Sequence, residues 1–192
     1  MKFVRKIVAI FFSLLALPII AKAQIPTSGN VFIGYSYARS AAFTGTANRS
    51  LNTWGWEASA EGKFLPWISV VADLDWHYGS HTFRTCASGS CGGQKVTLNT
   101  SVNHILFGPR ASISFGKYTP FAEVLLGVAH QSDNGGGISN SDTGFATAFG
   151  GGVDYKLIKG IALRFQGDSI HSSLFGLARN DFRLSTGVAF KF

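Results

Sequence analysis

The last eleven residues of the chain, 182–192, alternate strictly between apolar and polar side chains and end on an aromatic residue. A period of two is that of a β-strand, whose successive side chains point to opposite faces of the sheet. One face carries Phe182, Leu184, Thr186, Val188, Phe190 and Phe192, and the other carries Arg183, Ser185, Gly187, Ala189 and Lys191. Soluble proteins rarely place three phenylalanines and a leucine on a closing strand, so the pattern predicts an apolar face that does not meet water.

The amino-terminus has the features of a secretory signal peptide. Lys2, Arg5 and Lys6 precede an apolar run over residues 7–20, and Ala-Lys-Ala at 21–23 forms an A-x-A cleavage site. The apolar run is shorter than the roughly twenty residues of a membrane-spanning helix, and no later segment approaches that length. The sequence therefore predicts an exported protein without a membrane-spanning helix.

We expect a signal peptide at 1–23 and one mature domain at 24–192. Since only helices and closed barrels satisfy their backbone groups in lipid, this domain is either soluble or inserted as a β-barrel. Four of the 17 basic residues leave with the leader, which leaves 13 against 10 acidic residues, a charge of +3 that does not indicate nucleic-acid binding. The 23 glycines, the aromatic content of 14% and the charged content of 14% favour an all-β domain of many strands.

Turn signals divide the domain into eight strands. Three short ones contain Gly and Pro or Lys, and four longer stretches are rich in Gly, Ser, Asn and Thr. The short signals lie at 62–66, 116–120 and 156–160, and the long stretches at about 40–52, 79–98, 131–143 and 171–180. We predict an eight-stranded antiparallel up-and-down transmembrane β-barrel, with both chain ends and the short turns on the periplasmic side and four long loops outside.

The positions of the charges separate a membrane barrel from a soluble one, because a membrane barrel is apolar outside and can be polar inside. Every acidic residue of the predicted strands can share the polar phase of its strand, although Glu123 does so beside Phe121 and Leu125. The predicted polar network of the lumen consists of Glu57, Glu61, Asp73, Asp75, Arg110, Glu123, Asp154, Arg164, Asp168 and Arg183, with Lys191 beside it.

A soluble lipocalin-like carrier would reverse the two faces, and alternation alone leaves that alternative open. The aromatic residues favour the membrane. Near the loop-side strand ends the apolar phase carries a set that suits an interfacial girdle, namely Tyr35, Tyr37, Trp54, Trp56, Trp76 and Tyr78.

The two cysteines, Cys86 and Cys91, lie in one polar stretch of the exported domain. An oxidising compartment makes a disulfide the default, worth about 2 kcal/mol for so short a loop. The alternative, a metal-binding or redox pair, lacks the C-x-x-C spacing.

Three motifs carry a family resemblance: Leu-Phe-Gly-Pro-Arg at 106–110, Gly-Gly-Gly-Val-Asp-Tyr at 150–155 and Gly-Val-Ala-Phe-Lys-Phe at 187–192. With them the chain resembles the small outer-membrane barrels of the OmpA-like transmembrane-domain class. The resemblance implies an eight-stranded barrel in the bacterial outer membrane. It also implies that Phe192 takes part in recognition by the outer-membrane assembly machinery.

An eight-stranded barrel is just wide enough for side chains to fill, so we expect a lumen plugged by ion pairs and a structural or surface-interaction role. A narrow gated pore is the first alternative. We expect neither a cofactor nor a metal, although Asp73, Asp75 and His77 alternate on one face and could converge on a cation.

A lipid A-modifying enzyme is the second alternative. His171 and Ser173 share the outward phase, and a histidine can activate a serine nucleophile. The orienting acid is the weak point, since only Asp181 stands near the place for it, and we predict that the protein is not an enzyme.

The expected partners are outer-membrane lipid and lipopolysaccharide, the assembly machinery and an unknown surface ligand. Basic residues in or near the long stretches could meet lipid phosphates: Arg39, Arg49, Arg84, Lys95 and Arg179.

Overall fold

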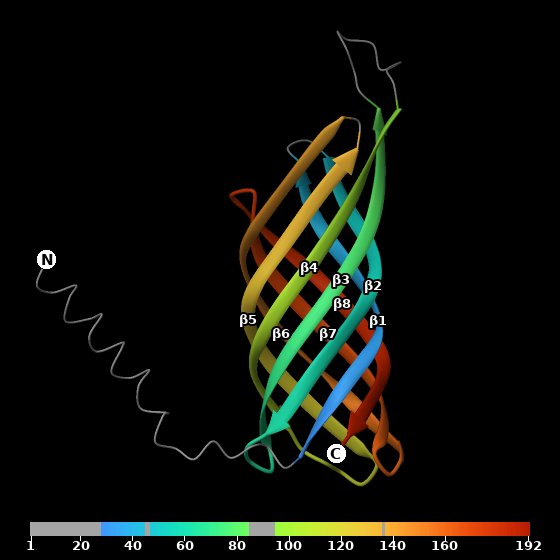
Figure 1. The fold of residues 1–192 in the computed structure, drawn as a ribbon, viewed down its shortest axis with the longest axis vertical. Helices are drawn as coiled ribbons and strands as arrows, with labels where there is room; N and C mark the ends of the chain where they lie inside the picture. Colours follow the sequence, from blue (N-terminus) through green and yellow to red (C-terminus); the bar gives the residue numbers. More distant parts are fainter. Residues whose placement is uncertain (1–27, 45–46, 85–94, 136) are drawn as a thin grey trace, which may run out of the picture.

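The computed structural model describes residues 28–44, 47–84, 95–135 and 137–192 of the 192-residue chain. Within these residues eight antiparallel strands form a closed barrel (Figure 1). The strands are β1 (Gly29–Thr44), β2 (Ala47–Lys63), β3 (Ile68–Arg84), β4 (Lys95–Ser112), β5 (Tyr118–Gly135), β6 (Ile138–Ile158), β7 (Ile161–Leu174) and β8 (Leu177–Lys191). No helix in this part of the chain is long and apolar enough to cross a membrane.

Each strand pairs with its neighbour in sequence, and the barrel closes between β1 and β8. The closing register runs from Asn30 opposite Lys191 to Ser40 opposite Asp181. At the rim, the Gly29 amide donates to the Phe192 carbonyl at 3.0 Å, and the Phe192 amide donates to Gly29 at 3.1 Å. The predicted fold class is therefore confirmed. The predicted signal peptide and the cysteine pair lie outside the described residues.

The three short connections lie at the end of the barrel where β1 begins and β8 ends (Figure 1). They join β2 to β3, β4 to β5 and β6 to β7, as the turn signals predict. Gly116 and Gly160 adopt positive φ values of 62° and 84° in two of these turns, a backbone region that glycine enters without steric cost.

At the opposite end the prediction of four long loops is wrong for three of them. The polar stretches continue as paired strands up to Thr44 opposite Ala47, Gly135 opposite Ile138 and Leu174 opposite Leu177. Ladder bonds use backbone groups, so a sequence rich in Ser, Thr, Asn and Gly can extend a hairpin that is already in register. In the fourth case β3 and β4 remain paired up to Arg84 opposite Lys95. The strands are 14 to 21 residues long, well beyond the roughly ten that cross a membrane.

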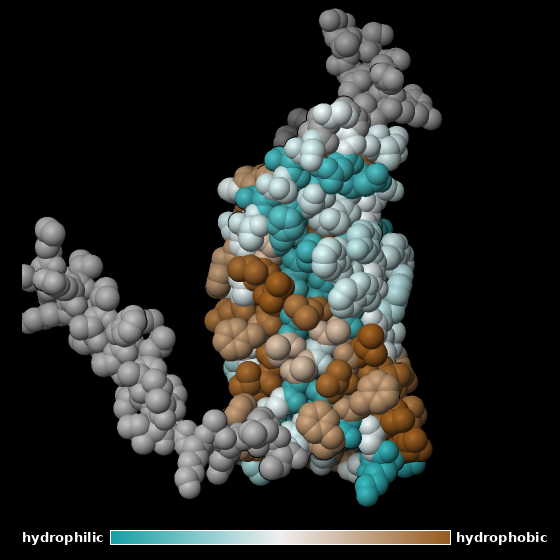
Figure 2. Space-filling model, in the orientation of Figure 1, coloured by the Kyte–Doolittle hydropathy of each residue, from teal (hydrophilic) through white to brown (hydrophobic). Residues whose placement is uncertain are grey.

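On the face shown in Figure 2, the outer surface is apolar over one half of the barrel and polar over the other. Strongly hydrophobic side chains gather toward the end that carries the short turns, and hydrophilic ones toward the end with the extended hairpins. Five residues of the predicted girdle are exposed: Tyr35, Trp54, Trp56, Trp76 and Tyr78. Tyr37 packs against Trp54 with 4.5 Å between ring centroids, and Trp56 stacks on Trp76 at 6.5 Å. Such a band of apolar side chains edged by aromatic rings is the exterior of a membrane-inserted barrel.

The lumen also contains apolar side chains, which the prediction of a polar lumen does not include. Part of the inner wall is lined by one buried cluster: Val71, Leu106, Leu125, Ala129, Ala146, Ala148, Ile170 and Leu174. Phe121 and Leu125 do accompany Glu123 inward, since their exposed fractions are 7% and 0%. The interior is therefore packed with both apolar and charged groups.

Candidate functional site: the charged lumen

All ten residues of the predicted polar network point into the barrel, and each is at most 5% exposed. Their ion pairs form two layers along the barrel axis, one near the short turns and one further in. Because strands fix which residues lie opposite one another, the layers follow from the register of the sheet. Glu61 lies beside Asn30 in the first layer, and Glu57 lies beside Asp75 in the second.

Arg110 anchors the first layer. Its Nε donates to Glu123 Oε2 at 2.7 Å, and Nη1 donates to Glu61 Oε2 at 2.9 Å. Its guanidinium carbon lies 4.3 Å from the centroid of the Phe121 ring. One guanidinium thus bridges β2, β4 and β5, and its desolvated charge is compensated on two sides.

Arg164 holds the other side of this layer. Its Nε donates to Asp154 Oδ1 at 2.7 Å, and Nη2 donates to Asp154 Oδ2 at 3.1 Å and to Asn30 at 3.2 Å. Lys191 Nζ lies 3.0 Å from Asp154 Oδ2. The Arg164 guanidinium carbon lies 4.8 Å from the Phe121 centroid, so both arginines of this layer contact one aromatic ring.

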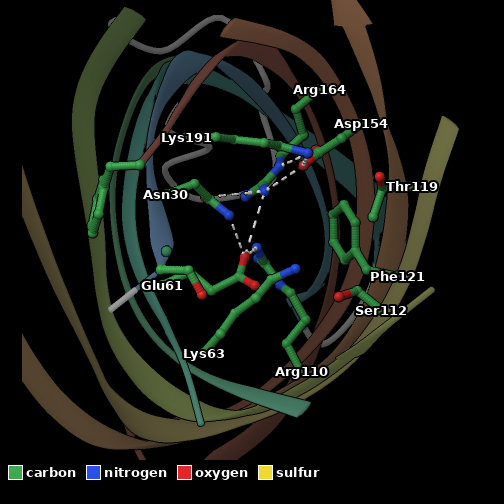
Figure 3. Close-up of a pocket in the computed structure, with 13 residues that line it drawn as sticks. Asn30, Glu61, Lys63, Arg110, Ser112, Thr119, Phe121, Asp154, Arg164 and Lys191 are labelled. Carbon is green, nitrogen blue, oxygen red and sulfur yellow. Dashed lines mark hydrogen bonds and ion pairs between the residues drawn. The ribbon is translucent and has the colours of Figure 1, made fainter. Parts of the chain in front are cut away.

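These groups line a cavity of about 190 Å³ at the end with the short turns (Figure 3). Lys63 and Lys191 add cationic side chains to its wall, and Phe192 lies at its edge. In the view along the barrel, the side chains of Asn30, Glu61, Arg110 and Arg164 meet near the axis. The cavity is thus a vestibule whose inner end is formed by ion-paired side chains.

Arg183 is the centre of the second layer and is fully buried. Its Nε and Nη2 donate to Asp168 Oδ2 at 3.0 and 2.8 Å, and its Nη1 donates to Asp73 Oδ1 at 2.8 Å and to Asp75 Oδ2. Glu57 Oε2 lies 3.5 Å from Nε. Four carboxylates therefore surround one guanidinium, so the acidic groups of this layer outnumber its arginine.

Two histidines, His77 and His104, complete this layer, each at most 2% exposed. Both turn Nδ1 toward the same carboxylate oxygen, Asp75 Oδ1, at distances of 3.1 and 2.7 Å. The other ring nitrogen of His77 lies 2.9 Å from Ser36 Oγ. Ser185 donates to Ser36 Oγ at 3.0 Å and also contacts Glu57.

Gln166 connects the two layers. Its side-chain nitrogen lies 2.9 Å from Glu123 in the first layer, and 2.9 and 3.1 Å from Asp168 and Glu57 in the second. Gly150 leaves room for the Asp168 carboxylate, because a Cβ at position 150 would lie 1.8 Å from Asp168 Oδ1. The charged groups thus form one network across the lumen.

A third polar group lies toward the extended hairpins. Arg179 donates to Asp181 at 2.9 Å and to Gln131 at 2.6 Å, while Asp133 accepts from Gln131 at 2.9 Å and from Thr100 at 2.6 Å. Arg179 therefore points inward rather than toward lipid phosphates. Arg39 is exposed, whereas the side chains of Arg49, Arg84 and Lys95 lie outside the described residues.

His171 and Ser173 lie on the outer surface, and His171 Nδ1 is 2.6 Å from the side-chain oxygen of Asn180. Asp181 points to the other side of the sheet, where it is 4% exposed and pairs with Arg179. The carboxylate that could have oriented the histidine is therefore on the opposite face. A serine nucleophile with a histidine and an aspartate is not assembled at this position.

Sequence reasoning missed the role of His104. The residue is in phase with Arg110 on β4, but its contact with Asp75 depends on the pairing of β3 with β4, which places these two residues directly opposite. A predicted hairpin register would have brought them together. Conversely, Asp73 does not join the two histidines. Its Oδ1 accepts from Arg183, and its Oδ2 has no hydrogen-bond partner among the described residues.

The comparisons with known proteins bear on the fold. No protein-family model matches the chain, and no curated protein matches its sequence. The solved structures similar to it include Ail, the attachment invasion locus protein of Yersinia pestis, in complex with the heparin analogue sucrose octasulfate. That match has 16% identity and a TM-score of 0.57, and covers 85% of this chain and 98% of that one. Neisserial surface protein A matches with 15% identity and a TM-score of 0.61, over 85% of this chain and 97% of that one. The chain has the fold of the small OmpA-like outer-membrane barrels, as the resemblance implies.

Proposed function

We propose that the protein is a non-conducting integral barrel of the bacterial outer membrane, which serves as a structural element and as a rigid surface for interactions outside the cell. The observation that carries this proposal is the occlusion of the lumen by two layers of buried ion pairs in series, centred on Arg110 and Arg183. A hydrated ion would have to separate both sets of pairs, at a cost of several kcal/mol for each uncompensated charge. A narrow pore is therefore the weaker candidate.

The extended hairpins support the surface role. The strands continue beyond the apolar band with mostly polar outer surfaces (Figure 2). A hydrogen-bonded hairpin holds its side chains in a fixed arrangement, so a partner would bind without first ordering a loop. Lipid headgroups and an external macromolecule are the expected contacts of this surface, and Phe192 at the opposite rim is the expected contact of the assembly machinery.

Conductance in planar bilayers, measured for wild type and for the Arg110→Ala variant, tests whether the lumen is plugged. Arg110→Ala removes one of the two arginines of the first layer and leaves Glu61 and Glu123 without their main partner. We expect a loss of stability of about 3 to 5 kcal/mol, seen as a lower midpoint temperature of the heat-dependent shift in gel mobility. We expect no channel openings from either protein, because the Arg183 layer remains. Openings from wild type would contradict the proposal, and openings from the variant alone would make the Arg110 layer a gate.

Epitope insertion in intact cells tests the orientation. Between Phe175 and Gly176, in the exposed turn from β7 to β8, an epitope should bind antibody added to whole cells. The matched control is an insertion between Lys159 and Gly160, in the short turn from β6 to β7, which should bind antibody only after the cells are opened. The reverse pattern would place the extended hairpins in the periplasm and remove the basis for a surface role.

A further inference from the structure

We propose that Asp75, His77 and His104 form a binding site for a divalent transition-metal ion of the zinc type inside the lumen. Their donor atoms, one carboxylate oxygen and two imidazole nitrogens, all lie within 4.8 Å of one another. Imidazole and carboxylate are the usual ligands of such ions, and three protein ligands with one open position is a common arrangement for zinc. The proposal concerns a ligand site and does not depend on the surface role.

The distances suit a tetrahedral ion. Asp75 Oδ1 lies 3.1 Å from His77 Nδ1 and 2.7 Å from His104 Nδ1. Ligands at the zinc bond lengths of about 2.0 to 2.2 Å stand roughly 3.3 Å apart around a tetrahedral ion, so these two distances have to lengthen only slightly to admit it. The three residues come from the paired strands β3 and β4, and the sheet holds them together.

The surrounding groups also match a metal site. A metal-bound histidine usually donates its other ring N–H to an oxygen, and Ser36 Oγ is 2.9 Å from His77 Nε2. A ligating carboxylate is usually held by a hydrogen bond, and Arg183 supplies one to the other oxygen of Asp75. In the closed barrel these contacts would hold two of the ligands in position around the ion.

The charge of this layer gives an independent reason for a cation. Glu57, Asp73, Asp75 and Asp168 surround Arg183, and all five side chains are at most 2% exposed. Asp73 Oδ2, Asp168 Oδ1 and His104 Nε2 have no hydrogen-bond partner among the described residues. Buried carboxylates need compensating positive charge, and a divalent ion at Asp75 would supply it.

Cobalt(II) is the probe, because tetrahedral cobalt is coloured and replaces zinc in sites of this type. The tag-free mature chain is refolded into detergent with cobalt, freed of loose metal with a chelator and checked for its heat-dependent gel shift. We expect about one cobalt ion per chain with visible absorption typical of a tetrahedral site. Refolding is used because the ligands are buried, so the ion would enter before the barrel closes.

His77→Gln and His104→Gln should each abolish the visible bands. Loss of a direct ligand should reduce affinity by more than the roughly 10- to 100-fold that loss of an outer partner costs. The matched control is His130→Gln with His171→Gln, which removes two exposed histidines and should retain the bands. Cys86→Ser with Cys91→Ser is the second control, and it should also retain them.

Folded wild-type protein that retains no cobalt and no zinc would overturn the proposal. The proposal would also be overturned if the bands persisted in the His77→Gln and His104→Gln variants but disappeared when the exposed histidines or the cysteines were replaced. Should the ligand variants fail to fold, X-ray absorption of wild type loaded with zinc decides the matter. The proposal requires the scattering of two histidine ligands around the zinc ion, and a spectrum without it contradicts the proposal.

Discussion

Replacing Arg183 with methionine should destabilise the barrel more than any other single change in the lumen. The arginine compensates four buried carboxylates, and methionine would fill part of its volume without a charge. Removal of one partner from a buried ion pair costs about 3 to 5 kcal/mol, and here several acids lose their partner at once. We expect a large loss in the urea midpoint of unfolding in detergent or a failure to refold.

The control for this change is Arg39→Met, which removes an exposed arginine from β1 and should leave the midpoint unchanged. If Arg183→Met does not fold, the double variant Arg183→Met with Asp168→Asn still tests the account. The added substitution removes one uncompensated carboxylate and should restore part of the stability, since Arg183 and Asp168 are in direct contact. An Arg183→Met protein as stable as wild type would show that the layer is not held by charge.

Replacing Phe107 with arginine should block insertion or strongly destabilise the inserted barrel. Phe107 is 64% exposed on the outer face of β4, and it pairs with Ala72 and Leu126 within the apolar band. An arginine on the lipid face costs about 2 to 4 kcal/mol at the bilayer midplane and about 0 to 1 near the interfaces. Urea unfolding of the protein folded into phospholipid vesicles measures the change.

Because the cost of an arginine depends on its depth in the bilayer, the matched control is an arginine placed outside the apolar band. Ser141→Arg adds the same charge to an exposed, outward-facing position of β6 near the end of an extended hairpin, and it should have almost no effect. If Phe107→Arg were as harmless as Ser141→Arg, the outer face of β4 would meet water. The soluble carrier would then become the better description.

Much of the fold could be predicted from the sequence because a period of two assigns each residue of a strand to one face. The acids of each strand fall on a single phase, and the short turns between β2 and β3 and between β4 and β5 carry Gly and Pro. These patterns led to eight strands, to the inward charges and to the aromatic girdle. The inward direction of Glu123 followed as well, although Phe121 and Leu125 accompany it.

Other features could not be predicted because alternation does not give height along the barrel axis. The separation of Arg110 and Arg183 into two layers depends on the register between strands, and so does the contact between Asp75 and His104. The lengths of the strands also escaped prediction. A stretch rich in Ser, Asn and Gly reads as a loop, yet the register set by the membrane-spanning part continues through residues 131–143 as a paired hairpin.

The direct test of the inside-out barrel is quenching of the native tryptophans by lipids with brominated acyl chains. All four tryptophans are exposed, with exposed fractions between 38% and 55%. Trp54, Trp56 and Trp76 lie on the outer face of β2 and β3, and Trp67 lies in the short turn between these strands. The sample is wild-type protein folded into vesicles, with its heat-dependent gel shift intact. We expect strong quenching of its emission relative to vesicles without bromine. Folded protein whose emission is unchanged by the brominated chains would contradict the membrane assignment and place the aromatic face in water.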